Sequence, residues 1–207
     1  MKKLLVVGAG GHARVVIDAA RTSAAWNVCA ILDDNSELWG RAIEGITVTG
    51  RIGDWPSWLN RTDALMVALG DNRLRREIQF AVTAAGLASA VVLHRAAVVA
   101  TSASVGAGTV VMAGGIINSN AKIGLGVIVN TGATIDHDCD IGDWTHIGPG
   151  VALCGDVSVG KCTLLGVGVK VIPGVRIGDR CVVGAGSVVI RDVPDDTRVA
   201  GVPARPL

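Results

Sequence analysis

The sequence predicts two domains of different architecture, an α/β domain over residues 1–93 and a parallel β-helix of about five coils over residues 94–207. Three observations predict this division. Strand-like and helix-like segments alternate in the first part, an aliphatic residue recurs at every sixth position in the second, and the 207 residues include only 1 Phe, 5 Trp and no Tyr. A core that lacks aromatic rings has to be filled by aliphatic and small side chains.

The first domain alternates short apolar runs with amphipathic stretches, which is the pattern of strands and helices in a parallel α/β sheet. Strands are expected at residues 4–7, 28–32, 64–69 and 90–93, and helices at residues 13–25 and 73–85. The second helix has an apolar stripe, so its charged side chains are expected to face solvent: Arg73, Arg75, Arg76 and Glu77. Three tryptophans in the intervening loops either pack against the sheet or stack on a substrate: Trp39, Trp55 and Trp58.

A glycine-rich turn, Gly8-Ala9-Gly10-Gly11-His12-Ala13, follows the first strand and opens the first helix. Glycines let a phosphate approach the backbone, and the N–H groups at a helix N-terminus face the anion. Asp33 and Asp34 end the next strand, where they can accept hydrogen bonds from a nucleoside. A domain this short has no second mononucleotide-binding half, which favours a nucleotide diphosphate on a sugar over a dinucleotide. A purely structural glycine turn is the third interpretation.

The second domain carries an internal repeat. Every sixth residue from Val99 to Val189 is aliphatic, sixteen times in succession. Four residues after each lies a small or β-branched residue. A period of six fits short strands joined by tight corners, three to a coil, which stack into a triangular prism. Glycines 18 residues apart mark one edge, where a positive φ or a close backbone approach is expected: Gly106, Gly124, Gly142, Gly160 and Gly178.

The segment Asp136-His137-Asp138-Cys139-Asp140 surrounds one imidazole with carboxylates. A carboxylate on one ring nitrogen fixes the tautomer and raises the basicity of the other nitrogen, as a general base requires, whereas the alternative is a solvated histidine at a polar corner. Cys139 occupies an inward small position, so we do not expect it to be a nucleophile.

His146 lies nine residues beyond His137, which is half of an 18-residue coil. The two histidines therefore face opposite ways on one prism, and they can share a site only if neighbouring subunits bring them together. Their spacing does not fit the closely spaced histidine pair of a three-histidine metal centre, so no metal is expected.

Charge and cysteine content exclude several classes of protein. The 19 Lys and Arg against 18 Asp and Glu leave a formal net charge of +1, which provides no basic field for nucleic acid. No apolar run approaches the roughly 18 to 20 residues that cross a bilayer. Five cysteines, an odd number without a C-x-x-C pair, predict buried free thiols. We expect a cytoplasmic protein without nucleic-acid or membrane partners.

The repeats resemble the hexapeptide-repeat family, whose fold is a left-handed parallel β-helix and whose best-known members are trimeric acyltransferases. Four further motifs extend the resemblance over the whole chain: Leu32-Asp33-Asp34, Ala68-Leu69-Gly70-Asp71-Asn72, His137-Asp138-Cys139 and Gly201-Val202-Pro203-Ala204-Arg205. With the glycine-rich turn, they make the chain similar to the bacterial nucleotide-sugar acetyltransferases of the PglD and NeuD type. This resemblance implies a Rossmann-like first domain, a homotrimer with active sites between subunits, and acetyl-CoA as co-substrate without a metal.

The resemblance also implies roles for individual residues. His137 would be the general base, and Asp138 would occupy the position of an acidic residue, often Glu, that assists it. The nucleotide sugar would be held through its diphosphate, nucleobase and sugar by Gly10, Gly11, His12, Asp33, Asp34 and Gly70. The acetyl-CoA groove would be lined by His146, Val167, Ala185 and Arg205.

The implied reaction is direct acetyl transfer from acetyl-CoA to the amino group of a UDP- or GDP-linked 4-amino-4,6-dideoxy sugar used in surface glycans. His137 would remove a proton as the amine attacks the thioester. Two alternatives stay open: O-acetylation of sialic acid or another sugar hydroxyl, and a trimeric scaffold or nucleotide-sugar sensor without catalytic activity.

Overall fold

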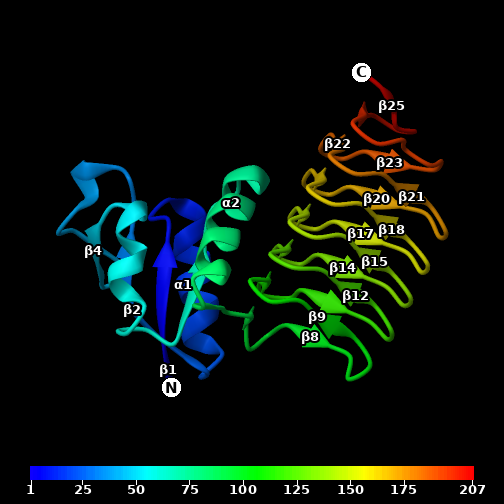
Figure 1. The fold of residues 1–207 in the computed structure, drawn as a ribbon. Coiled ribbons are helices and arrows are strands. Elements are labelled where there is room, and N and C mark those ends of the chain that lie inside the picture. The colour runs from blue at the N-terminus through cyan, green and yellow to red at the C-terminus, as the bar shows by residue number, and fades with distance from the viewer. The chain divides into compact units, whose positions relative to one another are not determined.

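The computed structural model describes all 207 residues and divides into two compact units, Met1–Arg95 and Ala96–Leu207. The first unit is an α/β domain, and the second is a left-handed parallel β-helix (Figure 1). The predicted fold class is confirmed. No helix of the chain is long and apolar enough to cross a bilayer.

The first unit is built on a six-stranded sheet in the order β3-β4-β2-β1-β5-β6, in which β1 pairs in parallel with β2 and β5. The strands of this unit are β1 Lys2–Val7, β2 Trp26–Leu32, β3 Ala42–Ile43, β4 Ile46–Gly50, β5 Ala64–Val67, β6 Ala88–Ser89 and β7 Val92–Leu93. Its helices are α1 Gly11–Thr22 and α2 Asn72–Ala84, with short 3-10 helices η1 Ser36–Leu38 and η2 Ile52–Trp58.

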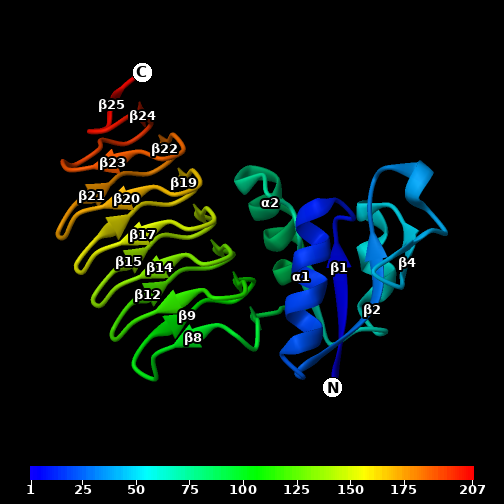
Figure 2. The same cartoon turned by 180° about the vertical axis from the view of Figure 1, so that it is seen from behind.

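Helices cover both faces of this sheet, which explains why consecutive residues are apolar and buried in its central strands, as in Leu4–Val7 and Ala64–Val67. Figure 1 shows α2 and η2 in front of the sheet, and Figure 2, from behind, shows α1 in front. On the η2 side the buried core joins Leu5, Leu32 and Leu65 of the strands to Trp58. Trp55 packs against this core, so packing is confirmed for two of the three tryptophans, whereas Trp39 is 44% exposed.

Two expectations for the helices are wrong. α1 ends at Thr22 rather than Ala25, because the Thr22 and Ser23 hydroxyls donate to carbonyls of the last turn and Ala24 adopts a left-handed φ of 56°. Arg75 does not face solvent but is only 1% exposed. Its guanidinium donates to Leu69 O at 3.0 Å and to Asn72 Oδ1 at 2.8 Å, and these bonds offset the cost of its burial.

The second unit is a three-sided prism in which each coil lies 18 residues beyond the last, as in the pairings Ile117↔Ile135 and Leu153↔Val171. Its three sheets have the orders β25-β24-β22-β19-β16-β13-β10, β23-β20-β17-β14-β11-β8 and β21-β18-β15-β12-β9. The strands are β8 Val98–Val99, β9 Ser104–Val105, β10 Val110–Val111, β11 Ile116–Ile117, β12 Lys122–Ile123, β13 Ile128–Val129, β14 Thr134–Ile135, β15 Asp140–Ile141, β16 His146–Ile147, β17 Ala152–Leu153, β18 Ser158–Val159, β19 Leu164–Leu165, β20 Lys170–Val171, β21 Arg176–Ile177, β22 Val182–Val183, β23 Val188–Val189, β24 Arg198–Ala200 and β25 Arg205–Pro206.

The lumen of the prism is filled as the repeat predicts. The sixth-position aliphatics from Val111 to Val189 are buried, and so are the small partners from Thr109 to Val193. The polar partners find acceptors inside: the Thr145 and Thr163 hydroxyls donate to backbone carbonyls at 2.6 and 2.7 Å. Aliphatic and small side chains fill this lumen, which accounts for the scarcity of aromatic rings in the second unit.

The glycine edge is explained by close approach and not by positive φ. A Cβ on Gly106 would lie 2.5 Å from Gly124 O, and one on Gly142 would lie 2.7 Å from Gly160 C. The left-handed residues of this edge come two positions later, among them Trp144 and Arg180 with φ of 54°. Each coil therefore needs glycine where it touches the next.

All five cysteines are free thiols, but two of them are exposed. Cys29 is exposed because it falls at the register shift between β1 and β2, where Leu4 pairs with Val28 and Leu5 with Ala30. Cys154 is exposed because it lies at a corner of the prism, directly after β17. Cys139 is buried, and burial raises the pKa of its thiol, which disfavours a nucleophilic thiolate.

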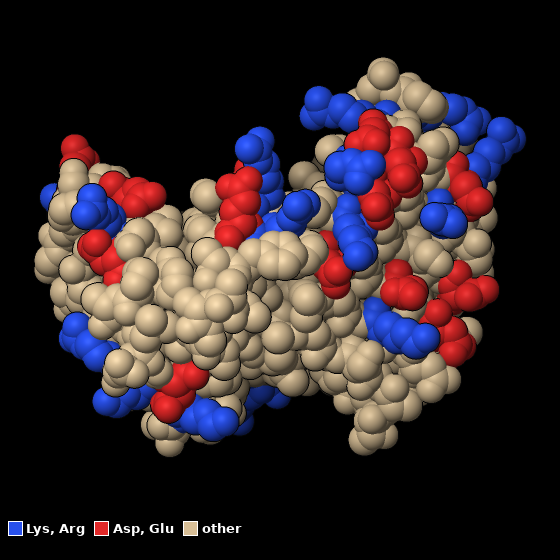
Figure 3. Space-filling model, in the orientation of Figure 1, with Lys and Arg blue, Asp and Glu red and all other residues tan.

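Acidic and basic side chains are intermixed over the C-terminal coils of the second unit (Figure 3). Arg180 pairs with Asp196 at 2.6 Å, and Lys161 pairs with Asp143 at 3.2 Å. This face carries no field of a single sign.

A Gly142→Ala substitution should lower the free energy of unfolding by about 1–3 kcal/mol, because the new methyl group forces the Gly160 backbone to shift. Chemical denaturation would measure the change. Gly53→Ala is the matched control, since nothing lies within 4 Å of a Cβ at Gly53. Equal stability of both variants would contradict the close-approach explanation.

Candidate functional site

His137 lies at the corner between β14 and β15, where its imidazole contacts the carboxylate of the next residue. The distance from His137 Nδ1 to Asp138 Oδ2 is 2.8 Å. An ionised carboxylate only accepts hydrogen bonds, so Nδ1 carries the proton and Nε2 keeps its lone pair. The contact is possible because Asp138 has a φ of 59°, which turns its side chain back toward the imidazole. The structure thus brings the two predicted catalytic residues together.

The charges around His137 favour its protonated form. The hydrogen bond with Asp138 is the largest cause that raises the pKa of His137, and the charge of Asp136 is the next. The same bond lowers the pKa of Asp138, and so does a hydrogen bond from Asn120. The imidazole is therefore a stronger base than an isolated histidine while its side chain remains 59% exposed.

Three residues of this corner were not predicted from the sequence. Asn118 Nδ2 donates to Asp136 Oδ1 at 2.9 Å, and Asn120 Nδ2 donates to Asp138 Oδ1 at 3.1 Å. Each asparagine lies 18 residues before its aspartate, so the coil length is the signal that could have found them. Gly155, 18 residues after His137, supports the ring from the other side: a Cβ there would lie 2.5 Å from His137 Nε2.

A polar cavity of about 640 Å³ lies beside the Asp138 carboxylate. Its volume is within the range of small-molecule sites, roughly 300–1,000 Å³. The residues that line it are Ser102, Ser104, Asn120, Lys122, Asp138, Cys139, Asp140, Asp156 and Ser158. Hydroxyl, amide, ammonium and carboxylate groups together suit a ligand rich in hydroxyl groups.

The residues predicted to bind acetyl-CoA lie along a different edge of the prism. His146 is in β16, and its Nε2 is 3.1 Å from Asn130 Nδ2. Val167 and Ala185 occupy the corners that follow β19 and β22 in the same sheet, and Gly186 N donates to Val167 O at 2.8 Å. Arg205 lies in β25 of that sheet. The structure therefore places these four residues in one sheet or at the corner that follows it, away from the corner of His137.

The glycine-rich turn of the first unit combines one structural glycine with two open ones. Gly8 has a φ of 104°, and a Cβ there would lie 2.9 Å from Ala68 O, so this position requires glycine. Nothing lies within 4 Å of a Cβ at Gly10, Gly11 or Gly70. Gly10 precedes α1 without any side-chain cap, which leaves the helix N-terminus open to an anion.

The acidic pair after β2 is partly engaged by the backbone. Asp33 Oδ2 accepts a hydrogen bond from Ala9 N at 2.7 Å, and Asp33 Oδ1 accepts one from Asn35 N at 2.8 Å. Asp34 Oδ1 accepts from Ile52 N at 2.9 Å. Asp33 thus ties the glycine-rich turn to β2, and Asp34 keeps Oδ2 for a ligand.

His12, in the first turn of α1, has an environment opposite to that of His137. The pKa of His12 is lowered to about 4, mainly by burial and secondly by the charge of Arg75. At neutral pH its imidazole is uncharged, so it can meet a phosphate only as a neutral N–H donor.

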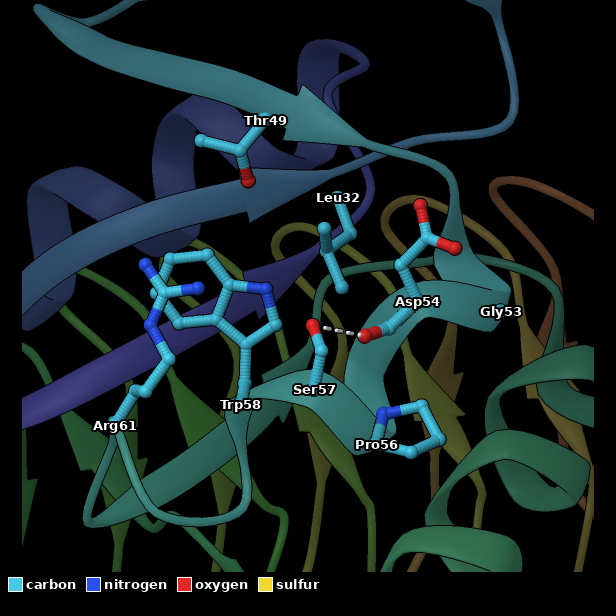
Figure 4. A pocket seen from close by; sticks show the side chains of 8 residues that line it. All are labelled: Leu32, Thr49, Gly53, Asp54, Pro56, Ser57, Trp58 and Arg61. Carbon is cyan, nitrogen blue, oxygen red and sulfur yellow. Dashed lines mark hydrogen bonds between the residues drawn. The ribbon is translucent and has the colours of Figure 1, made fainter.

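A second cavity of about 640 Å³ lies in the first unit, beside β4 and η2. Figure 4 shows Trp58 and Arg61 together at one end and Asp54 with Gly53 at the other, and the Arg61 guanidinium lies 4.1 Å from the centre of the Trp58 ring. The cavity lies next to a residue that the acidic pair contacts: Asp34 accepts a hydrogen bond from Ile52 N, and the following residue, Gly53, lines the cavity. Its planar cation–aromatic stack offers a surface for a flat ring.

Comparison with known proteins assigns both units. The model of the PglD N-terminal domain matches residues 3–82, and that of the bacterial transferase hexapeptide, six repeats, matches residues 156–191. Among curated protein sequences the comparison finds no match.

Several solved structures match the chain over its full length. PerB from Caulobacter crescentus, in complex with CoA and GDP-perosamine, is 42% identical with a TM-score of 0.92, and the match covers 100% of this chain and 98% of that one. The acetyltransferase domain of PglB from Neisseria gonorrhoeae, in complex with acetyl coenzyme A, is 37% identical with a TM-score of 0.95, covering 100% and 99%. WeeI from Acinetobacter baumannii, at 24% identity, has a TM-score of 0.88 over 100% of both chains and shares the fold.

Histidine-selective NMR titration should find His137 with a pKa above that of an ordinary histidine and His12 with a pKa near 4. In the Asp138→Asn variant the pKa of His137 should fall toward the ordinary value, because the charged hydrogen-bond acceptor is lost. The pKa of His12 serves as the internal control and should not change. A His137 pKa that ignores the substitution would contradict the described pair.

Proposed function

Since the chain belongs to the hexapeptide-repeat acetyltransferases with a PglD-type N-terminal domain, we propose that it acetylates the amino group of a nucleotide-linked 4-amino-4,6-dideoxy sugar with acetyl-CoA. The observation that carries this proposal is the His137–Asp138 contact of 2.8 Å at an exposed corner. Two matching structures support the substrate class: PerB holds CoA and GDP-perosamine, and the PglB domain holds acetyl coenzyme A.

The proposed reaction is a direct transfer without a covalent enzyme intermediate. The sugar amine attacks the thioester carbonyl carbon, and His137 Nε2 takes the proton that the nitrogen loses as the tetrahedral intermediate forms. Collapse of the intermediate breaks the C–S bond and releases the CoA thiolate, which the protonated imidazole can neutralise. Asp138 stabilises the imidazolium through Nδ1–H, since its carboxylate is already in contact.

A backbone donor for the thioester oxygen is available beside the base. The Gly155 N–H makes no hydrogen bond within the chain, and the residue lies directly against the His137 ring. We propose this N–H as a donor to the developing oxyanion.

The nucleotide part of the substrate belongs to the first unit. The open α1 N-terminus at Gly10 and Gly11 suits the diphosphate, with neutral His12 as an additional donor. Asp34 Oδ2 remains for N–H groups of the nucleobase, which uracil and guanine both offer. Asp34 and the neighbouring cavity would therefore select the nucleobase.

The separation of His137 from the acetyl-CoA residues supports a homotrimer. His137 lies at the corner after β14, whereas His146, Val167 and Ala185 follow the sheet of β16, β19 and β22. A complete site needs both edges, so we propose that the base comes from one subunit and the CoA groove from its neighbour. We also propose a cytoplasmic location, on the ground that five thiols are free and two of them exposed.

A thiol-release assay with acetyl-CoA tests the proposed activity. CoA release is expected with one member of a panel of UDP- and GDP-linked 4-amino-4,6-dideoxy sugars, and that member identifies the base. Free sialic acid is the contrast: release with it alone would replace N-acetylation by O-acetylation. If no acceptor causes release of CoA and acetyl-CoA does not bind, the interpretation as a scaffold or nucleotide-sugar sensor would replace the proposed activity.

His137→Ala should reduce turnover by about 100- to 10,000-fold, because the proton acceptor of the reaction is removed. Its oligomeric state and stability should equal those of the unaltered chain, since the imidazole is exposed. Light scattering and steady-state kinetics would measure both. Near-normal turnover would exclude His137 as the base.

Gly10→Ala should weaken the binding of UDP or GDP on the order of tenfold, the equivalent of about 1.4 kcal/mol, while leaving the unfolding midpoint unchanged. The methyl group meets nothing within the chain but fills the space that the diphosphate would occupy. Gly8→Ala is the comparison, since it should lower stability. Calorimetry that finds normal nucleotide binding by Gly10→Ala would refute this diphosphate site.

A further inference from the structure

Asn120 lies one coil before Asp138, at the same corner of the prism. Its Nδ2 donates to Asp138 Oδ1 at 3.1 Å, while Asp138 Oδ2 contacts His137 Nδ1 at 2.8 Å. Each carboxylate oxygen therefore has its own partner. The amide of Asn120, the carboxylate of Asp138 and the imidazole of His137 form one continuous chain of hydrogen bonds.

The backbone holds both ends of this chain in register. Asn120 and Asp138 have nearly equal φ angles, 62° and 59°. The Asn120 N–H donates to Ser102 Oγ at 3.1 Å, and the Asp138 N–H donates to Ser119 O at 3.0 Å. The two side chains consequently leave the prism in parallel, one coil apart, at the separation that a single hydrogen bond spans.

Packing alone does not hold the carboxylate in place. The side chain of Asp138 is 52% exposed and borders the polar cavity, so packing restricts its rotamer only in part. Rotation about its terminal bond would move Oδ2 away from Nδ1. The hydrogen bond from Asn120 is the one contact that opposes this rotation independently of His137.

We propose that Asn120 is a positioning residue for the acetyl transfer: it orients the Asp138 carboxylate, which in turn holds the His137 tautomer that exposes Nε2 as the base. This inference rests on the proposed function, because it assigns Asn120 to the base of that reaction. Asn120 touches neither the imidazole nor the reacting atoms in this arrangement and acts through Asp138 alone.

A structural explanation competes with this proposal and makes a different prediction. Asparagine tolerates left-handed backbone, so Asn120 could be present only for its φ of 62°. Glycine adopts that conformation more readily still. An Asn120→Gly variant therefore keeps the corner and removes the amide, which separates the two explanations without straining the fold.

The experiment compares the pH dependence of kcat and kcat/KM for the unaltered chain, Asn120→Gly, Asp138→Asn and the double variant. Asn120→Gly should lower kcat by about 3- to 10-fold, the loss equivalent to one hydrogen bond, with KM for both substrates unchanged. The acid limb of its profile should move to lower pH, since a poorly oriented Asp138 supports the imidazolium less while Asp136 and Asp156 still act on it.

Coupling in the double variant provides the stricter test. Once Asp138 is Asn, the amide has no carboxylate to orient, so Asn120→Gly should have no further effect on kcat. Glu44→Gly is the control for glycine at a left-handed position, because Glu44 has a φ of 51°, is exposed, and lies in the first unit outside the cavities and the proposed site. It should leave the profile unchanged. Unfolding midpoints should agree among all variants.

Three outcomes decide the matter. The proposal is supported if Asn120→Gly lowers kcat, shifts the acid limb of the pH profile, and has no further effect on kcat in the Asp138→Asn background. A normal kcat and pH profile for Asn120→Gly, or an additive loss in the double variant, overturns it while leaving the proposed function intact if His137→Ala is inactive. Near-normal activity of His137→Ala removes the proposed function, and this inference with it.

Discussion

The stacking of one 18-residue coil on the next is the constraint on which the second unit depends. The backbone N–H groups of each strand donate to carbonyls beside the paired strand of the next coil, as Lys122 N does to Cys139 O while Lys122 pairs with Asp140. This register repeats without an insertion, so every side chain belongs to a column that runs along the prism. Residues one coil apart therefore contribute to the chemistry of the unit as directly as neighbours in sequence do.

The corner that holds the proposed base is a direct product of these columns. Asn120, Asp138 and Asp156 occupy one column of left-handed residues, and His137 stands against Gly155 in the adjacent one. A carboxylate beside an imidazole is common on protein surfaces, but here coil spacing supplies a second partner for that carboxylate. Hydrogen bonds therefore hold the side chains of this exposed site in position, as packing would hold those of a buried site.

The sequence was sufficient to predict the fold of the second unit, because the period of six leaves a single arrangement of inward residues. The contact of His137 with Asp138 was also predictable, because the two residues are adjacent. The sequence was insufficient where side chains cross between elements. Arg75 lies on the buried side of α2 because carbonyls from the preceding loop satisfy its guanidinium, which no helical pattern encodes. The engagement of Asp33 by Ala9 and the contact of Asn120 with Asp138 likewise require side-chain positions in space.

The two histidines at the proposed ligand sites show how one residue type serves two roles. Carboxylates and solvent surround His137, so its charged form is favoured and its pKa is raised, which makes its imidazole a stronger base. Burial and the Arg75 charge keep His12 neutral, so it can donate to a phosphate without becoming a competing acid. A bound diphosphate would raise the pKa of His12, yet from about 4 even a substantial rise leaves the imidazole largely uncharged at pH 7. Nucleotide binding therefore does not require protonation of His12, and His137 is the group that we propose for proton transfer in the reaction.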